Sequence, residues 1–430
     1  MKIGKLRINM IENDSYVDIN NAFANVGESV QAVAMEYIFD AIGIPKHDIV
    51  KIDQCRIKEY RGDKVIFPLR LPLSKDSVDK YFPLPDSIIP IFMSLHLHDD
   101  IFEDRPDMVE YFKKYEPIGC RDEHSCGYFK KHGIEAYMMG CYTLCMPERP
   151  ESIKGEEIFF VDASEELMSE VPQEMKDKST KISHAVPFME YPVTHTEDER
   201  LERMAAQYLN RYREKAKLVI TSRLHAAAPC MAMGIPVVLA SNNADFRYAW
   251  IDKFLPIYQL SDFSNIKWKA EKIEIGYVRD LLMAFFKEAV TSGKASRKIL
   301  RKLDDIYRER KPAQYYKCFR ERLEKISENE IYNKSFNYAI WGAGCHGIFA
   351  YELMTEMYPE ATLTVVVDKF KKGKMFGVPI ISKEELLDYN FQHICITTNP
   401  GKNEAIKECE KLSANGYKVG YTVITSQQKS

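Results

Sequence analysis

The chain has 430 residues, a formal net charge of −3 at pH 7 and a hydrophobic fraction of 45%. This length exceeds one ordinary hydrophobic core and predicts two or three globular domains. The small net charge excludes a bulk electrostatic attraction to nucleic acid or to an anionic membrane, so an anion site must be a local cluster of cations.

Targeting segments and metal motifs are absent from the sequence pattern. No apolar run has the length of a signal peptide core or a transmembrane segment. The ten cysteines are scattered without a Cys-x-x-Cys pair or a matching histidine spacing, which argues against zinc and against a disulfide framework. We therefore expect a cytoplasmic protein with no metal and no nucleic-acid partner; a homo-oligomer stays open.

Short apolar strands alternate with amphipathic helices along the first 280 residues, which is typical of α/β layering with largely parallel sheets. A helix is predicted at about residues 28–42, and Thr196 with Glu199 fits a capping box at the start of a second helix. The predicted strands are 6–11, 49–52, 65–69, 89–94, 158–161, 218–221 and 237–239.

Composition changes along the chain predict four segments. We expect two Rossmann-like lobes at residues 1–150 and 151–280, followed by a helical, highly charged stretch. Residues 281–334 are predicted to form an exposed helical connector. A third, small Rossmann-like domain is predicted at residues 335–430.

The predicted strand at residues 218–221 runs directly into Ser222, Arg223, Leu224 and His225. In open parallel sheets, ligands bind beyond the carboxyl ends of the strands, and the helix that follows favours anions at its N-terminus. Arg223 offers a planar pair of donors to a phosphate or carboxylate, and His225 can transfer a proton near neutral pH. Structural capping of a buried strand end is the alternative interpretation.

A second polar segment, Gly119-Cys120-Arg121-Asp122, follows the apolar step at residues 117–118. Arg121 stands where a strand should end. Asp122 is a good residue to start the helix that precedes Gly133, a good helix stop. Taken alone, Arg121 and Asp122 fit either a local ion pair or a ligand contact.

The segments Asn25-Val26-Gly27-Glu28, Gly119-Cys120-Arg121-Asp122 and Thr221-Ser222-Arg223-Leu224-His225 follow one another in the order found in polysaccharide pyruvyl transferases, and the chain resembles this family over roughly residues 1–280. The resemblance implies two lobes arranged as in GT-B glycosyltransferases, with the active site in the cleft. It also implies transfer of the enolpyruvyl group of phosphoenolpyruvate to a sugar, commonly as a cyclic ketal in exopolysaccharide biosynthesis.

By this resemblance, Arg121, Arg223 and His225 would contact phosphoenolpyruvate, and Asn25 and Gly27 would lie in the loop after the first strand. Ser222 is expected to bind substrate beside them. One departure stands out, because many members of the family carry Asp where this chain has Cys141. No role for a carboxylate at that position carries over to this chain.

The chemistry of such a transfer needs fixed cations for the two anionic groups of the donor. Two arginines from opposite lobes meet this need and hold the donor in register. His225 is the expected proton-transfer residue, and Arg223 is expected to stabilise the leaving phosphate. The scheme requires no cofactor, and the expected partners are phosphoenolpyruvate and a sugar or glycan acceptor.

Two histidines end the strand predicted at residues 89–94. His96 and His98 alternate onto one face. Contact with the acceptor sugar is the favoured interpretation, and metal binding is the alternative. Phe246, Tyr248 and Trp250 beside Arg247 fit either core packing or stacking on a sugar.

The C-terminal unit begins with a predicted strand that leads into a glycine turn. Gly342, Gly344 and Gly347 have the spacing of a dinucleotide-binding fingerprint, and Asp368 follows a second strand about twenty residues later. A nucleotide or NAD is therefore one expected ligand, with Asp368 on the ribose. A structural module with an empty glycine turn is the other interpretation.

Two rival functions accompany pyruvyl transfer. A GT-B-like glycosyltransferase that uses a nucleotide sugar would keep the fold and change the donor. A non-catalytic nucleotide-binding protein would bind ligand through the C-terminal unit and turn over no donor.

Overall fold

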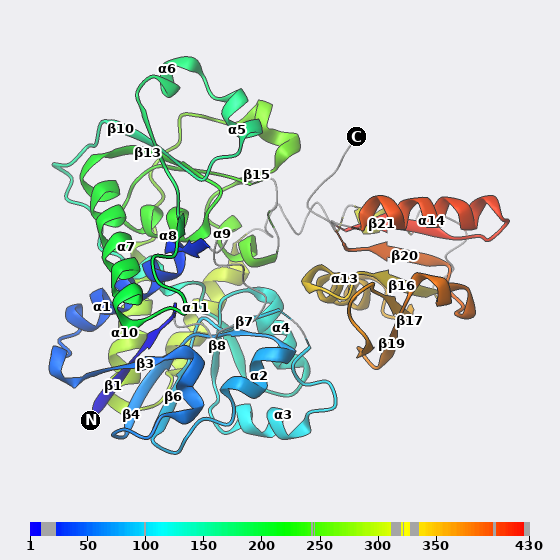
Figure 1. Cartoon of the computed structure of the whole chain (residues 1–430), viewed down its shortest axis with the longest axis horizontal. Coiled ribbons are helices and arrows are strands. Elements are labelled where there is room, and N and C mark those ends of the chain that lie inside the picture. Colours follow the sequence, from blue (N-terminus) through cyan, green and yellow to red (C-terminus); the bar gives the residue numbers. More distant parts are fainter. Residues whose placement is uncertain are drawn as a thin grey trace.

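The computed structural model describes residues 1–9, 23–98, 100–241, 244, 246–310, 320, 322–326, 335–398 and 401–424. Figure 1 shows parallel sheets flanked by helices in each part of the chain, which confirms the predicted α/β class. Within these ranges, no helix combines the length and the hydropathy needed to cross a bilayer.

The first lobe is built on a parallel sheet of four strands in the order β3 (Ile49–Asp53), β1 (Lys2–Arg7), β4 (Val65–Leu69) and β6 (Ile88–Phe92). Every residue of β4 is buried, as expected for a parallel strand covered on both faces. The other elements are β2 (Phe23–Asn25), α1 (Val26–Ala41), β5 (Pro72–Leu73), α2 (Lys75–Tyr81), β7 (His96–Leu97), α3 (Pro106–Lys113), β8 (Ile118–Cys120), α4 (Glu123–Lys131) and β9 (Ala136–Met138).

The second lobe contains a five-stranded parallel sheet in the order β11 (Ser179–Ile182), β10 (Glu157–Val161), β13 (Ala216–Thr221), β14 (Val237–Ala240) and β15 (Ile257–Tyr258). Gly234, which follows the C-terminus of α8 (Leu224–Ala232), has a left-handed backbone with φ 71°, a conformation common for glycine after a helix. The remaining elements are α5 (Glu165–Glu170), α6 (Gln173–Lys176), β12 (Ala185–Pro187), α7 (His195–Lys215), α8 (Leu224–Ala232) and α9 (Ala249–Asp252).

The helices α10 (Gly276–Ser292) and α11 (Arg297–Glu309) correct the expectation of an exposed connector. Leu282, Phe285 and Phe286 of α10 are fully buried, as are Leu300 and Leu303 of α11. These side chains belong to the core that the two lobes share. Most of the charged residues of this stretch lie on the outer faces of the helices, because each helix is amphipathic, and the buried Asp304 accepts a hydrogen bond from the amide of Met138.

The C-terminal unit, orange to red in Figure 1, has a six-stranded sheet in the order β18 (Gly373–Met375), β19 (Val378–Ile381), β17 (Thr362–Val367), β16 (Asn337–Trp341), β20 (His393–Ile396) and β21 (Gly420–Val423). Its helices are α13 (Cys345–Met357) and α14 (Lys402–Ala414). Apolar side chains on the two faces of this sheet form two clusters of their own, separate from the core of the lobes.

Two local predictions are corrected by the structure. The first strand is β1 at Lys2–Arg7 rather than at residues 6–11, because Ile3 pairs with Ile49 of β3 and the four central residues are buried. Residues 10 and 11 lie outside the described ranges. The cap of α7 is Thr194, whose side chain accepts a hydrogen bond from the amide of Glu197 at 3.2 Å, so Thr196 is not the capping residue.

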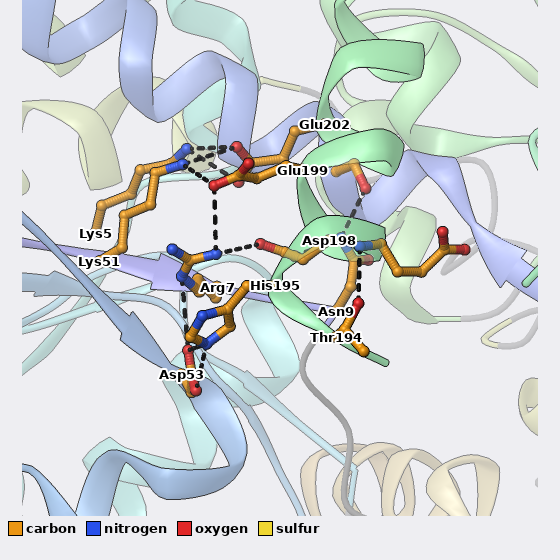
Figure 2. A network of polar contacts seen from close by, with 12 residues as sticks. Lys5, Arg7, Asn9, Lys51, Asp53, Thr194, His195, Asp198, Glu199 and Glu202 are labelled. Atoms are coloured by element: carbon orange, nitrogen blue, oxygen red, sulfur yellow. Dashed lines mark hydrogen bonds and ion pairs between the residues drawn. The ribbon is translucent and has the colours of Figure 1, made fainter. Parts of the chain in front are cut away.

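A network of charged side chains joins the first-lobe sheet to the start of α7 (Figure 2). Lys5 is 1% exposed, and its Nζ lies 3.0 Å from a carboxylate oxygen of Glu202. Arg7 lies 3.6 Å from both Asp53 and Asp198. This interlobe network consists of Lys5, Arg7, Asn9, Lys51, Asp53, His195, Asp198, Glu199 and Glu202. Both lobes contribute to it, so it fixes one lobe against the other.

Candidate active site

A cavity of about 320 Å³ lies where the ends of strands from both lobes meet. Most of the side chains in its walls are charged or polar. Among the described residues, four arginines and one glutamate supply the fixed charges. The lining residues are Asn25, Gly27, Glu28, Arg70, Pro72, His96, His98, Arg121, Arg223, Leu224, His225, Arg247 and Tyr248.

Arg223 and His225 reach the cavity because β13 ends at Thr221 and α8 begins at Leu224. Thr221 Oγ1 accepts a hydrogen bond from the amide of Arg223 at 2.9 Å and fixes the turn. The guanidinium Nε of Arg223 donates to Asp162 Oδ2 at 2.7 Å. Asp162 sits at a positive φ of 48° and does not cap a helix. It orients Arg223 at the edge of the cavity instead.

Arg121 enters the cavity from the other lobe, directly after β8. The residue is 4% exposed, and within the described part of the chain its Nε has no hydrogen-bond partner. Burial, followed by the charge of Arg70, lowers the pKa of Arg121 from its ordinary value. A buried guanidinium with a donor left without a partner is costly. An anion bound in the cavity would offset this cost.

Glu28 and Arg70 are site residues that the sequence analysis missed. Arg70 Nη2 lies 3.0 Å from Glu28 Oε2, and Gln31 Nε2 donates to the same oxygen at 2.7 Å. Burial opposes the charge of Glu28, but the charges of the neighbouring cations, Arg70 first, and the hydrogen bond from Gln31 outweigh burial and lower its pKa to about 2. Arg70 directly follows β4, so the strand-end rule that identified Arg121 could also have found it.

His225 is buried against α1. Its Nδ1 lies 3.8 Å from Glu28 Oε1. Burial lowers the pKa of His225 to about 3, although the carboxylate of Glu28 acts in the opposite direction. The imidazole is therefore neutral at pH 7 while the site holds no anion. A bound anion would add negative charge nearby and raise this pKa.

Asn25 and Gly27 have structural roles at the cavity wall. The side chain of Asn25 caps α1 by accepting a hydrogen bond from the amide of Gly27 at 3.0 Å. A Cβ at Gly27 would lie 2.9 Å from Asn25 Oδ1 and 3.2 Å from the Cβ of His225. Glycine at this position lets His225 approach the start of α1.

His96 and His98 both line the cavity, and their ring centroids are 4.4 Å apart. Asp122 Oδ2 accepts a hydrogen bond from His96 Nδ1 at 2.8 Å. Asp122 therefore binds His96 rather than forming the local ion pair with Arg121 considered above. Within the described ranges, no three His, Cys, Asp or Glu side chains gather as metal ligands would.

Ser222 is not among the described residues that line the cavity, and its contact with substrate stays a prediction. Its hydroxyl donates to the backbone carbonyl of Asp162 at 2.8 Å, and its own carbonyl accepts from the Tyr248 hydroxyl at 2.7 Å. Ser222 thus supports the turn that carries Arg223. Of the nearby aromatic residues, Tyr248 reaches the cavity, whereas Trp250 is buried in the core.

In the C-terminal unit, the glycine turn follows β16. A Cβ at Gly342 would lie 2.7 Å from Thr397 Oγ1, and one at Gly347 would lie 2.2 Å from the carbonyl of Gly342, whereas the space around Gly344 is open. Asp368 accepts a hydrogen bond from the amide of Ala343 at 2.8 Å and two more from the loop after β17. Its carboxylate thus organises the turn.

The fold and the cavity define a two-lobed α/β protein with a pocket suited to a small anion. Residues 80–243 match the model of the polysaccharide pyruvyl transferase family. The resemblance found in the sequence is thereby confirmed, and the family indicates a transferase that acts on a sugar acceptor. The matched range contains Arg121, Arg223 and His225 and ends before the C-terminal unit.

One similar solved structure is a functionally uncharacterized protein from Klebsiella pneumoniae. The similarity covers 56% of this chain and 84% of that protein, with 14% sequence identity and a TM-score of 0.29. None of the curated proteins matches the chain.

Proposed function

We propose that this protein transfers the enolpyruvyl group of phosphoenolpyruvate to a pair of hydroxyls on a sugar of a glycan or glycan precursor, closing a ketal. The observation that carries the proposal is the convergence of Arg121, Arg223 and His225 on one cavity of about 320 Å³. Arg121 follows β8 of the first lobe, whereas Arg223 and His225 belong to the turn between β13 and α8 of the second lobe.

The charges of the cavity fit the donor. Phosphoenolpyruvate carries a phosphate and a carboxylate, and the lining offers four guanidinium groups against the single carboxylate of Glu28 among the described residues. Arg121 is buried, and its Nε has no hydrogen-bond partner among the described residues, so a bound anion would stabilise it. Arg223, oriented by Asp162, would bind the second anionic group from the opposite lobe and hold the donor in register.

His225 is the residue that we expect to transfer a proton to the donor. Protonation of the methylene carbon makes the neighbouring C2 electrophilic, and the C2–O bond to phosphate can then break. The bound dianion and the Glu28 carboxylate 3.8 Å away both favour the protonated imidazole. Glu28 would thus keep His225 charged when the donor is present, while Arg223 stabilises the leaving phosphate.

The proposal is tested by incubating the full chain with phosphoenolpyruvate and a panel of methyl glycopyranosides that carry free diols. We expect release of inorganic phosphate and a product heavier than the sugar by the pyruvate ketal, both detected by mass spectrometry and phosphate assay. His47→Gln, at an exposed side chain, serves as the unchanged control. Failure of the donor to bind, measured by calorimetry, or of every diol to react would refute pyruvyl transfer.

The same assay separates the rival functions. A glycosyltransferase would release a nucleoside diphosphate from a nucleotide sugar and ignore phosphoenolpyruvate. A non-catalytic protein would be stabilised by NAD or a nucleotide with no turnover, since a ligand raises the melting temperature by mass action. We keep a nucleotide or NAD as the proposed ligand of the glycine turn at Gly342, Gly344 and Gly347.

A further inference from the structure

The acceptor hydroxyls must lose their protons as they attack C2 of the donor, and His225 cannot serve this need while it delivers a proton to the methylene carbon. A second group with the opposite protonation state is required. The cavity contains another histidine that is held by a carboxylate, namely His96 on β7. Its surroundings differ from those of His225 in a way that suits a base.

Asp122 fixes the ring of His96. The two side chains are 2% and 0% exposed, and Oδ2 of Asp122 lies 2.8 Å from Nδ1 of His96. The other oxygen, Oδ1, accepts hydrogen bonds from the amide and the hydroxyl of Ser125, both at 2.8 Å. A carboxylate oxygen can only accept, so Nδ1 of His96 carries the ring proton. In the neutral ring, Nε2 then holds the basic lone pair.

The charges around His96 keep it neutral at rest. Burial, followed by the charge of Arg121, lowers the pKa of His96 well below its ordinary value. An imidazole that carries no proton at pH 7 on Nε2 can accept one at once. The groups that face it are Asp122 from α4, Arg121, His98, Arg247 and Arg70.

We propose that His96, positioned by Asp122, is the general base that takes the proton from the attacking acceptor hydroxyl. This inference rests on the proposed pyruvyl transfer. As the hydroxyl oxygen bonds to C2, its proton passes to His96 and the C2–C3 electron pair takes a proton from His225. The C2–O bond to phosphate then breaks, the second hydroxyl adds to C2, and its proton leaves with the released phosphate. Over the whole reaction, two hydroxyl protons are lost, one appears on C3 and one on phosphate.

The geometry of the pair gives Asp122 a part distinct from that of Glu28. Asp122 lies behind His96 and accepts from it, so the imidazolium formed after proton abstraction is stabilised by a short ion pair of 2.8 Å. Glu28 stands farther from His225, at 3.8 Å, and shares its charge with Arg70. The two histidines are thus prepared for opposite proton transfers.

The test compares His96→Asn with the unaltered protein. The amide of Asn can still donate to Asp122 but offers no base. We expect the Kd for phosphoenolpyruvate to stay within about threefold, and kcat with a reactive methyl glycopyranoside to fall roughly 100-fold or more, the usual loss for an acid–base group. We expect kcat of the unaltered protein to fall toward low pH as His96 becomes protonated, and we expect this fall to be absent from the variant.

Asp122→Asn provides the positioning control. It retains the helix cap, because Asn also caps well, but can stabilise the other ring tautomer of His96. We expect it to lower kcat about tenfold or more with little change in the Kd for phosphoenolpyruvate. Turnover by His96→Asn within about threefold of the unaltered rate overturns the role of His96 alone.

A measurement without acceptor completes the design. ¹⁵N-histidine NMR of the full chain at pH 7 should show His96 neutral with the proton on Nδ1, and finding it on Nε2 overturns the inference. If the unaltered protein neither binds phosphoenolpyruvate nor releases phosphate from it, the proposed function itself is refuted. The two failures are thereby distinguishable.

Discussion

Replacing Arg121 by Met should make the empty protein more stable while it removes donor binding. Arg121 is 4% exposed, its Nε has no partner among the described residues, and the neighbouring charge of Arg70 further opposes its own. Replacing buried charges with apolar side chains of similar volume is often neutral or stabilising by about 1–4 kcal/mol. Met retains most of the length of Arg, so the gain should not be cancelled by a cavity.

The assay is a pair of thermal melts with and without phosphoenolpyruvate. Without donor, the variant should melt at or above the temperature of the unaltered protein, with about 2–4 °C for each kcal/mol gained in a domain of moderate size. With donor at 100 times its Kd, the unaltered protein should gain about 2.7 kcal/mol, and the variant should gain nothing. A variant that melts well below the unaltered protein without donor, yet is still stabilised by it, would refute the reasoning.

Three further outcomes are expected. His225→Ala should lower turnover by roughly two to four decades, measured as phosphate release. Gly27→Ala should lower kcat/KM tenfold or more, because a Cβ there would press on His225, whereas Gly127→Ala, with nothing within 4 Å, should leave turnover unchanged. Acid should destabilise the protein: burial lowers the pKa of His184, His225 and His393 to about 4, 3 and 3, so the unfolded chain binds protons that the folded chain does not. The free energy of unfolding should fall by about 1 kcal/mol for each of these histidines between pH 6.5 and pH 5.5. Urea unfolding at each pH measures this change, and a constant free energy of unfolding over this range would contradict the expectation.

Much of the site followed from one rule, that ligands gather beyond the carboxyl ends of parallel strands. Arg121, Arg223 and His96 were found because each follows a recognisable apolar step. The rule also applies to Arg70, but the sequence around a single arginine after a strand does not show which carboxylate will pair with it. Glu28 becomes its partner only when α1 is placed over the sheet.

The fold class could also be predicted from the sequence, and the incorrect local predictions share one physical cause. α11 read as a solvated connector because its charged residues outnumber the apolar ones, yet Leu300, Leu303 and Tyr307 are fully buried. A narrow apolar stripe is enough to bury one face of a helix when the core surface it packs against is already formed. The sequence also did not indicate that the hydroxyl of Ser222 donates to the backbone carbonyl of Asp162. Such hydrogen bonds depend on tertiary placement, which the local sequence does not encode.

The continuous core of the two lobes, from Ile3 to Tyr307, bears on any attempt to redesign this protein by exchanging its halves. A transplanted second lobe would have to bring acids at the positions of Asp198 and Glu202, since Arg7 and the buried Lys5 would otherwise each lose one of their counter-charges. It would also have to be followed by helices that fit the apolar surface of the recipient's first lobe. Modular recombination at the lobe boundary should therefore yield insoluble chimeras unless these contacts are transferred together.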